Sequence, residues 1–407
     1  MKNPKVAVVG GGAAGFFAAI TCKKNYPDAE VSLYEKTPKV LTKVKVSGGG
    51  RCNLTNATTH ITDFSKAYPR GSKAMKKLLK EFSPQDTVQW FERHGLSLYA
   101  QADQRMFPTT NNSQSVIDLF LQLTQSLHIK IHTRKTLTRL QPKADSGFEL
   151  HFSGNEMVHA DKVILTMGGQ PKQKGFEPLK PTNHTIVPPV PSLFTFNMPD
   201  EKTADLMGVS VPEVMLRITG TKLKSEGALL MTHWGVSGPA VLKLSAIGAR
   251  SLEEKGYRFQ VQVNWCNKPD EMAFREEFAR NLAVMKKRKV GNKNPFQLPE
   301  RLWLFLLEKK GISPDMKWGD LGKKRWNQLI ATLLNDTYEV SGKTTFKEEF
   351  VTCGGIDLSE VNLKSMESKK CKSLYFAGEV LNIDGITGGF NFQSAWTTAY
   401  VAGQLRG

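Results

Sequence analysis

The chain has 407 residues, of which 40% are hydrophobic and 23% are charged, so it is an ordinary globular sequence long enough for two or three domains. No stretch approaches the roughly 20 consecutive apolar residues that a membrane helix needs, and no apolar signal segment precedes the first strand. The five cysteines are scattered and never spaced as Cys-x-x-Cys, which argues against a disulfide framework or a zinc site. We therefore expect a soluble cytoplasmic protein without a bound metal.

The net charge of +18 is concentrated in two regions of the chain. Residues 1–82 hold 15 Lys and Arg against 5 Asp and Glu, and residues 268–330 hold 15 against 8, which gives +10 and +7. Basic side chains recur at helical spacing in the first region and form a run in the second: Lys73, Lys76, Lys77, Lys80, Lys286, Lys287, Arg288 and Lys289. This pattern is typical of a solvated surface or of one that binds a polyanion.

The amino-terminal part alternates between predicted strands and helices. An apolar strand over 5–9 stops at three glycines, a small-residue helix follows over 13–22, and a second strand covers 30–34, which is the order of a βαβ unit. Helices are then predicted over 71–82, 87–94 and 114–127, and strands over 130–132, 136–140, 148–152, 158–160 and 161–166. This alternation predicts an α/β fold.

The middle of the chain changes character. Residues 175–199 are rich in proline and lack a period, which indicates a crossing between domains. Strands are predicted over 194–197, 213–219, 228–231 and 257–264, and helices between about 270 and 335, most clearly over 299–309 and 322–334. Strands over 338–340, 349–352 and 373–377 precede a last helix that begins near Gly389.

Two glycine-rich segments carry the chemistry. Gly10 to Gly15 is a GxGxxG between a strand and a helix, and Glu35 follows twenty residues later as the acid expected on a ribose diol, so the segment predicts dinucleotide binding. Residues 374–391 are predicted to form a strand, then Gly378 and Glu379, then a loop and the start of a helix. FAD needs such a second grip for its ribityl hydroxyls and ring carbonyl; Glu379 is the ribityl candidate, with Asp384 as its rival.

The sequence resembles the bacterial NAD(P)/FAD-dependent oxidoreductases of the BaiN/RdsA family, some of which carry an aminoacetone oxidase label. The resemblance spans essentially the whole chain. Its motifs are residues 10–15, the SGGGRCNxTN run at 47–56, residues 105–108, 232–239 and 366–369, and residues 376–393. It implies a glutathione-reductase-type FAD-binding domain with an inserted small β-barrel domain and an inserted helical domain. The expected boundaries are 1–190 with 347–407, 191–268 with 336–346, and 269–335.

The motifs and the resemblance together predict a set of FAD-binding residues. These are Gly10, Gly12, Ala13, Ala14, Gly15, Glu35, Lys36, Gly49, Gly50, Arg51, Cys52, Asn53, Leu137, Met167, Gly168, Gly378, Glu379, Asp384, Gly388, Gly389, Phe390 and Asn391. Arg51, Cys52 and His233 are the catalytic candidates. Cys52 has no second cysteine in its loop, so it is either a packing residue or a proton donor, and His233 either faces the flavin or supports a local loop.

Three functions remain open. The first is reduction of a carbon–carbon double bond by hydride transfer from reduced flavin, with uridine in ribosomal RNA becoming dihydrouridine, a reaction that the resemblance implies. The second is a small-molecule flavin oxidoreductase, either an enone reductase or an amine oxidase, and the third is a non-catalytic flavin-bound RNA-binding factor. A second GxGxxG after a strand is absent from the sequence, so either NAD(P)H docks transiently at the flavin as the electron donor, which is the expectation, or a donor of another kind is used. Residues 170–176 are shorter and more basic than the corresponding loop of many relatives, which leaves the substrate open.

Overall fold

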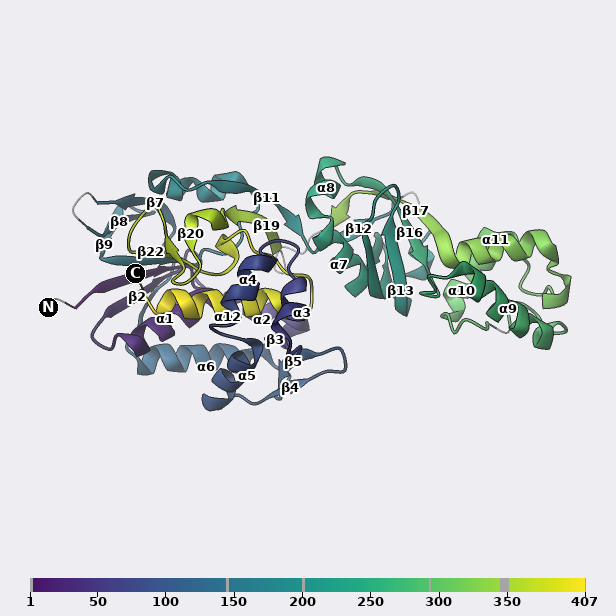
Figure 1. Ribbon diagram of the computed structural model, residues 1–407, viewed down its shortest axis with the longest axis horizontal. Helices are drawn as coiled ribbons and strands as arrows, with labels where there is room; N and C mark the ends of the chain where they lie inside the picture. The colour runs from purple at the N-terminus through teal and green to yellow at the C-terminus, as the bar shows by residue number, and fades with distance from the viewer. Residues whose placement is uncertain (1–2, 144–145, 200–201, 293, 345–350, 407) are drawn as a thin grey trace. The chain divides into compact units, whose positions relative to one another are not determined.

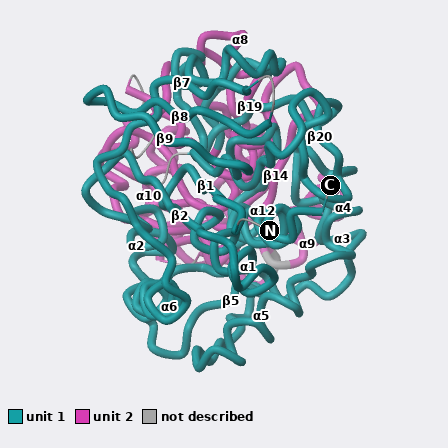
Figure 2. The backbone as a smooth tube through the Cα atoms, turned by 90° about the vertical axis from the view of Figure 1, so that its left-hand side faces the viewer, with its two compact units in different colours: residues 1–192, 346–407 teal, residues 193–345 magenta. Residues whose placement is uncertain are grey.

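The computed structural model describes residues 3–143, 146–199, 202–292, 294–344 and 351–406. The chain forms two compact units (Figures 1 and 2). Unit 1 comprises Met1–Ser192 and Phe346–Gly407, and unit 2 comprises Leu193–Thr345. Unit 1 is therefore built from the two ends of the chain. No helix in the described ranges has the length and apolarity needed to cross a membrane.

A seven-stranded sheet in the order β20-β21-β22-β10-β1-β2-β6 forms the centre of unit 1. Its strands are β1 (Lys5–Val9), β2 (Glu30–Tyr34), β6 (Lys130–His132), β10 (Lys162–Leu165), β20 (Val361–Asn362), β21 (Glu367–Ser368) and β22 (Leu374–Phe376). The five strands from β22 to β6 are parallel to one another. Their carboxyl ends therefore meet at one edge of the sheet, where α/β proteins bind ligands.

The helices of unit 1 pack around this sheet. Helix α1 (Ala13–Asn25) contacts β1, β2 and β10 as well as two other helices, α12 (Phe390–Gly403) and α6 (Ser113–Ser126). These contacts explain why α1 is buried continuously from Ala14 to Cys22 and consists mainly of small and aromatic residues. The other helices are α2 (Thr42–Gly50), α3 (Ile61–Lys66), α4 (Ser72–Leu78) and α5 (Pro84–Arg93).

Three smaller sheets complete unit 1. They are β3 (Thr55–Asn56) with β5 (Arg105–Pro108) and β4 (Leu98–Ala100), then β7 (Leu137–Pro142) with β8 (Phe148–Phe152) and β9 (Glu156–Ala160), and β11 (Ile186–Ser192) with β19 (Val351–Ile356). The expected strand over 349–352 is described only from residue 351 onward.

The proline-rich crossing contains regular structure that its sequence concealed. Residues Gln173–Thr182 form the 3-10 helix η1, and within the described ranges β11 pairs with β19 alone. Pro188 and Pro189 fall where the register of this pair shifts, between Val187 and Val190. Proline has no N–H to donate, so a strand accepts it at such an irregularity.

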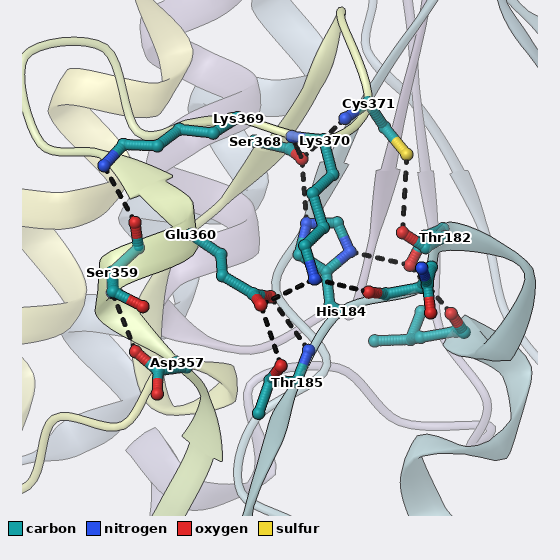
Figure 3. A network of polar contacts seen from close by, with 12 residues as sticks. Thr182, His184, Thr185, Asp357, Ser359, Glu360, Ser368, Lys369, Lys370 and Cys371 are labelled. Atoms are coloured by element: carbon teal, nitrogen blue, oxygen red, sulfur yellow. Dashed lines mark hydrogen bonds and ion pairs between the residues drawn. The ribbon is translucent and has the colours of Figure 1, made fainter.

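A polar network attaches the start of β11 to the β20–β21 region (Figure 3). The ring nitrogens of His184 lie 2.8 Å from Ser368 Oγ and 2.8 Å from Thr182 Oγ1. The Glu360 carboxylate accepts hydrogen bonds from Thr185 N and Oγ1 and from Lys370 Nζ, at 2.6–2.8 Å. The residues of the 366–369 motif therefore support the segment that leads out of unit 1.

Unit 2 contains a second seven-stranded sheet, in the order β17-β16-β13-β14-β15-β12-β18. Its strands are β12 (Thr195–Asn197), β13 (Ser210–Ile218), β14 (Lys224–Thr232), β15 (Gly235–Ser237), β16 (Arg258–Asn264), β17 (Asp336–Ser341) and β18 (Lys343–Thr344). Its helices are α7 (Pro239–Ile247), α8 (Ala249–Glu254), α9 (Glu271–Met285), α10 (Glu300–Lys309) and α11 (Gly322–Asn335). One hydrophobic core runs through both the sheet and the helices. The expected separation of 191–268 and 269–335 into two domains stays a prediction.

Candidate cofactor site

The carboxyl edge of the first sheet brings the two glycine-rich segments into contact. Gly10 follows β1, and a Cβ at this position would lie 2.2 Å from the carbonyl oxygen of Thr166, which follows β10. Gly378 follows β22, and a Cβ there would lie 2.8 Å from the Cβ of Ala14. Only glycine fits at either position, so the two ends of the chain pack directly against each other.

The first turn of α1 is left open toward this edge. Its N-cap is Gly12, no side chain caps the helix, and the first turn contains no acidic residue. A Cβ on Gly12 or on Gly168 would meet nothing within 4 Å. The exposed N–H groups and the positive end of the helix dipole therefore face space in which an anionic group can be held.

Glu35 closes the glycine turn from the end of β2. Its carboxylate accepts hydrogen bonds from the N–H of Gly11 and from the N–H and hydroxyl of Thr37, each at 2.8 Å. Lys36 beside it is exposed. Leu137 is buried at the start of β7, and Met167 follows β10 next to Gly168.

The 47–56 run begins where α2 loses its helical geometry and ends in β3. Helix α2 is interrupted at Ser47, Gly48 and Gly49, and the φ angles of the two glycines, 59° and 69°, lie in the left-handed region. A Cβ on Gly49 or Gly50 would meet open space. The glycines therefore turn the chain and expose backbone at the same time.

The two catalytic candidates of this run differ in accessibility. Arg51 is half-buried, its guanidinium lies 4.3 Å from the centre of the Phe107 ring, and its Nε donates to Gly48 O at 3.3 Å. Cys52 is completely buried, and this burial raises the pKa of its thiol to about 12 although a hydrogen bond with Ser47 acts in the opposite direction. This placement favours the packing role for Cys52 over proton donation.

The end of the same run contacts the start of α12. Asn56 Nδ2 donates to Gly388 O at 3.1 Å, and Thr55 Oγ1 donates to Gln393 Oε1 at 2.6 Å. In the amide orientation that satisfies both of its polar atoms, the side-chain oxygen of Asn53 accepts a hydrogen bond from Gly389 N at 2.9 Å. Helix α12, like α1, has a glycine N-cap and no side-chain cap.

Glu379 occupies a small polar cluster directly after β22. Its carboxylate accepts from Lys43 Nζ at 2.7 Å and from Thr352 N at 2.8 Å. A Cβ on Gly169 would lie 2.4 Å from Glu379 Oε1 and 2.3 Å from Thr352 Oγ1. Lys43 and Thr352 carry no motif that would have identified them in the sequence.

Asp384 is fully buried and has partners of its own. Its carboxylate accepts from Arg70 Nε at 2.7 Å, from the Arg70 terminal nitrogen and from Ser192 Oγ at 2.9 Å. Burial raises the pKa of Asp384, while Arg70 and Ser192 act to lower it. These contacts favour Glu379 over Asp384 as the ribityl ligand.

The remaining residues of the closing segment hold the backbone in place. The Asn391 side chain exchanges two hydrogen bonds with the backbone of Gly385, at 2.8 and 2.9 Å. Phe390 is buried, and its carbonyl oxygen accepts from Tyr68 OH at 2.7 Å.

His233 belongs to unit 2, at the turn between β14 and β15. It is exposed, and its ring meets that of Trp234 edge to face at 4.3 Å between centres. Its predicted catalytic role stays a prediction.

The basic side chains predicted to meet a polyanion lie at the surface. Lys73, Lys76 and Lys77 of α4 are exposed, while Ala74, Met75 and Leu78 on its opposite side are buried. Lys80 is exposed as well but follows the helix, which ends at Leu78 and not at the expected residue 82. Residues 286–289 of unit 2 are exposed as well. Among them, Lys289 pairs with Asp315 at 2.8 Å.

The residues of unit 1 fit a dinucleotide cofactor. Among the described residues, open space lies over Gly12 at the start of α1 and over Gly49 and Gly50 at the end of α2. Two buried oxygens near Glu379, Thr352 Oγ1 and Asn382 Oδ1, have no hydrogen-bond partner among the described residues. Buried polar atoms are nearly always paired, so these atoms are consistent with a polar ligand. Nowhere in the described ranges do three His, Cys, Asp or Glu residues cluster as metal ligands would.

The comparisons with known proteins point the same way. Residues 4–405 match the profile of the HI0933-like protein Rossmann domain. The chain is 28% identical to a 3-dehydro-bile acid delta(4,6)-reductase of Clostridium scindens, over 98% of both chains. It is 29% identical to a ribosomal RNA dihydrouridine synthase of Escherichia coli, over 99% of this chain and 98% of the other.

A solved structure of similar fold is the 3-ketosteroid-delta4-(5alpha)-dehydrogenase of Rhodococcus jostii RHA1. Its TM-score is 0.51 at 11% identity, with 99% of this chain and 98% of the other covered. At this identity the likeness concerns the fold alone.

Proposed function

This chain belongs to the HI0933-like family of FAD-dependent oxidoreductases, and from that premise we propose that it binds FAD in unit 1 and reduces uridine in ribosomal RNA to dihydrouridine. The observation that carries the proposal is the meeting of the Gly10–Gly15 turn with Gly378 at one edge of a parallel sheet. The predicted membership of the BaiN/RdsA-like family is confirmed.

Each part of the site has a role in holding the cofactor. The open first turn of α1 would hold the pyrophosphate, Glu35 the adenosine ribose, and Glu379 the ribityl chain. The first turn of α12 would face the ring carbonyl, because its positive end stabilises negative charge there. Bound FAD supplies hydride-transfer chemistry, and NAD(P)H is the proposed transient electron donor.

The exposed lysines of α4 support the proposal that the substrate is a polyanion. Their helix is tied to the closing segment: Arg70, two residues before α4, pairs with Asp384, and Ile386 N donates to Ala67 O at 2.9 Å. Phosphates held by α4 would therefore lie on the element that fixes the segment leading into α12. The names of two relatives, from Escherichia coli and Haemophilus influenzae, specify ribosomal RNA.

A small-molecule substrate is the second candidate. It is supported by the name of the Clostridium scindens relative, which specifies reduction of a bile-acid derivative. In that case the basic surface has no part in the reaction. A non-catalytic flavin-bound RNA-binding factor remains the third candidate.

One comparison distinguishes these functions. Dihydrouridine is measured by mass spectrometry in ribosomal RNA from cells with and without the gene, and from deleted cells that carry the gene on a plasmid. Loss on deletion and return on complementation are expected. Unchanged dihydrouridine together with NAD(P)H oxidation in the presence of small enones or amines would select the second candidate. Salt-sensitive RNA binding without flavin turnover would select the third.

A further inference from the structure

Thr352 on β19 has a hydroxyl that the protein leaves unsatisfied. The residue is 1% exposed, and Oγ1 has no hydrogen-bond partner within the described part of the chain. A buried hydroxyl without a partner destabilises the folded protein, so such groups are rare unless a ligand or water completes them. Asn382 Oδ1 is another buried oxygen that no described residue pairs with, and it lies three residues after Glu379.

The hydroxyl of Thr352 faces the same point as the Glu379 carboxylate. The two residues are joined by the hydrogen bond from Thr352 N to Glu379 Oε1 at 2.8 Å. A Cβ on Gly169 would come within 2.4 Å of both Thr352 Oγ1 and Glu379 Oε1, so the two oxygens pack against the same glycine and lie close to one point of the site.

The chemistry of the pair suits a chain of hydroxyl groups. An ionised carboxylate only accepts hydrogen bonds, whereas a threonine hydroxyl both donates and accepts. A ligand with several adjacent hydroxyls needs both kinds of partner, and the ribityl chain of a flavin has such hydroxyls.

We infer that Thr352 is a cofactor-binding residue whose hydroxyl bonds the ribityl chain of FAD beside Glu379. The inference rests on the proposed binding of FAD. It adds the returning strand β19 as a third part of the site, next to the opening glycine turn and the closing segment.

The test uses the full-length protein and two substitutions. Thr352→Val keeps the shape and removes the hydroxyl, and Thr352→Ser keeps the hydroxyl. We expect the Kd for FAD to rise about 3- to 10-fold in T352V and to stay within about 2-fold in T352S. Because the hydroxyl has no partner among the residues that the structure describes, the Tm of T352V measured without FAD should be equal to or higher than that of the unaltered protein. If the hydroxyl made a merely structural hydrogen bond, its removal would lower the Tm instead.

Two controls restrict the interpretation. Thr124→Val removes a buried hydroxyl of the same unit that bonds the carbonyls of Phe120 and Leu121, and it should leave the Kd for FAD unchanged. ADP lacks the ribityl chain, so T352V should bind ADP as the unaltered protein does.

Several outcomes would overturn the inference. Equal FAD affinity of T352V and the unaltered protein would remove Thr352 from the site while leaving the proposed function intact. A lower apo Tm in T352V would show that the hydroxyl bonds a structural water, and an equal loss of ADP affinity would contradict the ribityl assignment. Failure of the unaltered protein to bind FAD would overturn the proposed function and this inference together.

Discussion

Gly12 and Gly15 lie in one turn but differ in their surroundings. A Cβ on Gly15 would lie 1.8 Å from the carbonyl oxygen of Gly10, so this glycine permits the close packing of α1 against β1. A Cβ on Gly12 would meet only open space, and its φ of −93° suits any residue. Gly15 therefore serves the fold, while Gly12 keeps the helix terminus accessible.

The two substitutions to alanine should separate these roles. We expect Gly15→Ala to lower the free energy of unfolding by about 2–3 kcal/mol, because the methyl group overlaps the backbone. Gly12→Ala should change it by less than about 1 kcal/mol but weaken FAD binding about 10-fold or more, since the methyl group occupies the approach of the pyrophosphate. Urea unfolding measures the free energy of unfolding of each variant, and titration with FAD measures its affinity for the cofactor. Unaltered FAD affinity in G12A would contradict the assignment of the pyrophosphate to this turn.

At the scale of secondary-structure elements, the strands β11 and β19 link the cofactor site to the proline-rich crossing at residues 175–199. Ser192, the last residue of β11, donates to Asp384, and Thr352 in β19 donates to Glu379. The Glu360 network holds the start of β11 against the β20–β21 region (Figure 3). Both acids of the closing segment are thus bonded to the strands that carry the chain to and from unit 2.

The Glu360 contacts predict a pH-dependent contribution to stability. Burial acts to raise the pKa of Glu360, but hydrogen bonds from Lys370 and Thr185 outweigh it and lower the pKa from 4.5 to about 2. A carboxyl whose pKa is depressed in the folded state stabilises the protein fully above its unfolded pKa and loses this effect as the pH falls. At pH 7, Glu360→Gln should therefore lower the free energy of unfolding by about 1–2 kcal/mol. This is less than the full pKa shift implies, because the carboxylate retains some contact with solvent.

The measurement is the unfolding free energy of both proteins from about pH 7 down to about pH 3. The difference between them should shrink below about pH 4.5, where unfolded Glu360 becomes protonated. Glu81→Gln, which removes an exposed pair with Arg406, should change stability by less than about 0.5 kcal/mol at every pH. A difference for E360Q that is constant across this range would show that the contacts do not depend on the charge.

For the molecule as a whole, charge is the dominant property. The net charge of +18 attracts polyanions at long range, and exposed lysines on α4 offer direct phosphate contacts. Contacts of this kind release counterions, so binding should weaken steeply as salt is added.

Substituting the lysines of α4 together with Lys80, which follows it, tests whether this part of the chain is the contact surface. The variant replaces Lys73, Lys76, Lys77 and Lys80 with Gln. Each lost phosphate contact lowers the steepness of log Kobs for ribosomal RNA against log salt by about 0.7–0.9, so we expect the four changes to lower it by about 3. The control replaces four exposed lysines on other parts of unit 1, namely Lys39, Lys143, Lys364 and Lys372, and has the same net charge. Equal slopes for the two variants would assign the effect to net charge and exclude α4 as a specific surface.

The sequence by itself determined the local features of this protein. Apolar spacing predicted the strand, turn and helix around Gly10–Gly15, and the motifs of the opening and closing segments identified the family. These features were predictable because a strand, a tight turn and a helix start each depend on a few neighbouring residues. Helix α7 was missed because its residues are mostly apolar whether they are buried, as Leu244 is, or exposed, as Ile247 is, so they show no amphipathic period.

The tertiary structure alone decided which distant residues meet at the site. Asp384 is paired with Arg70 across 314 positions, Thr352 N is bonded to Glu379, and the Cys52 thiol points into the core. None of these contacts leaves a spacing signal, because their residues lie on loops and on β19, outside the parallel strands, and only the folded chain brings them together. Local chemistry therefore sets the elements of this protein, and the packing of segments that are far apart in the chain sets the composition of its site.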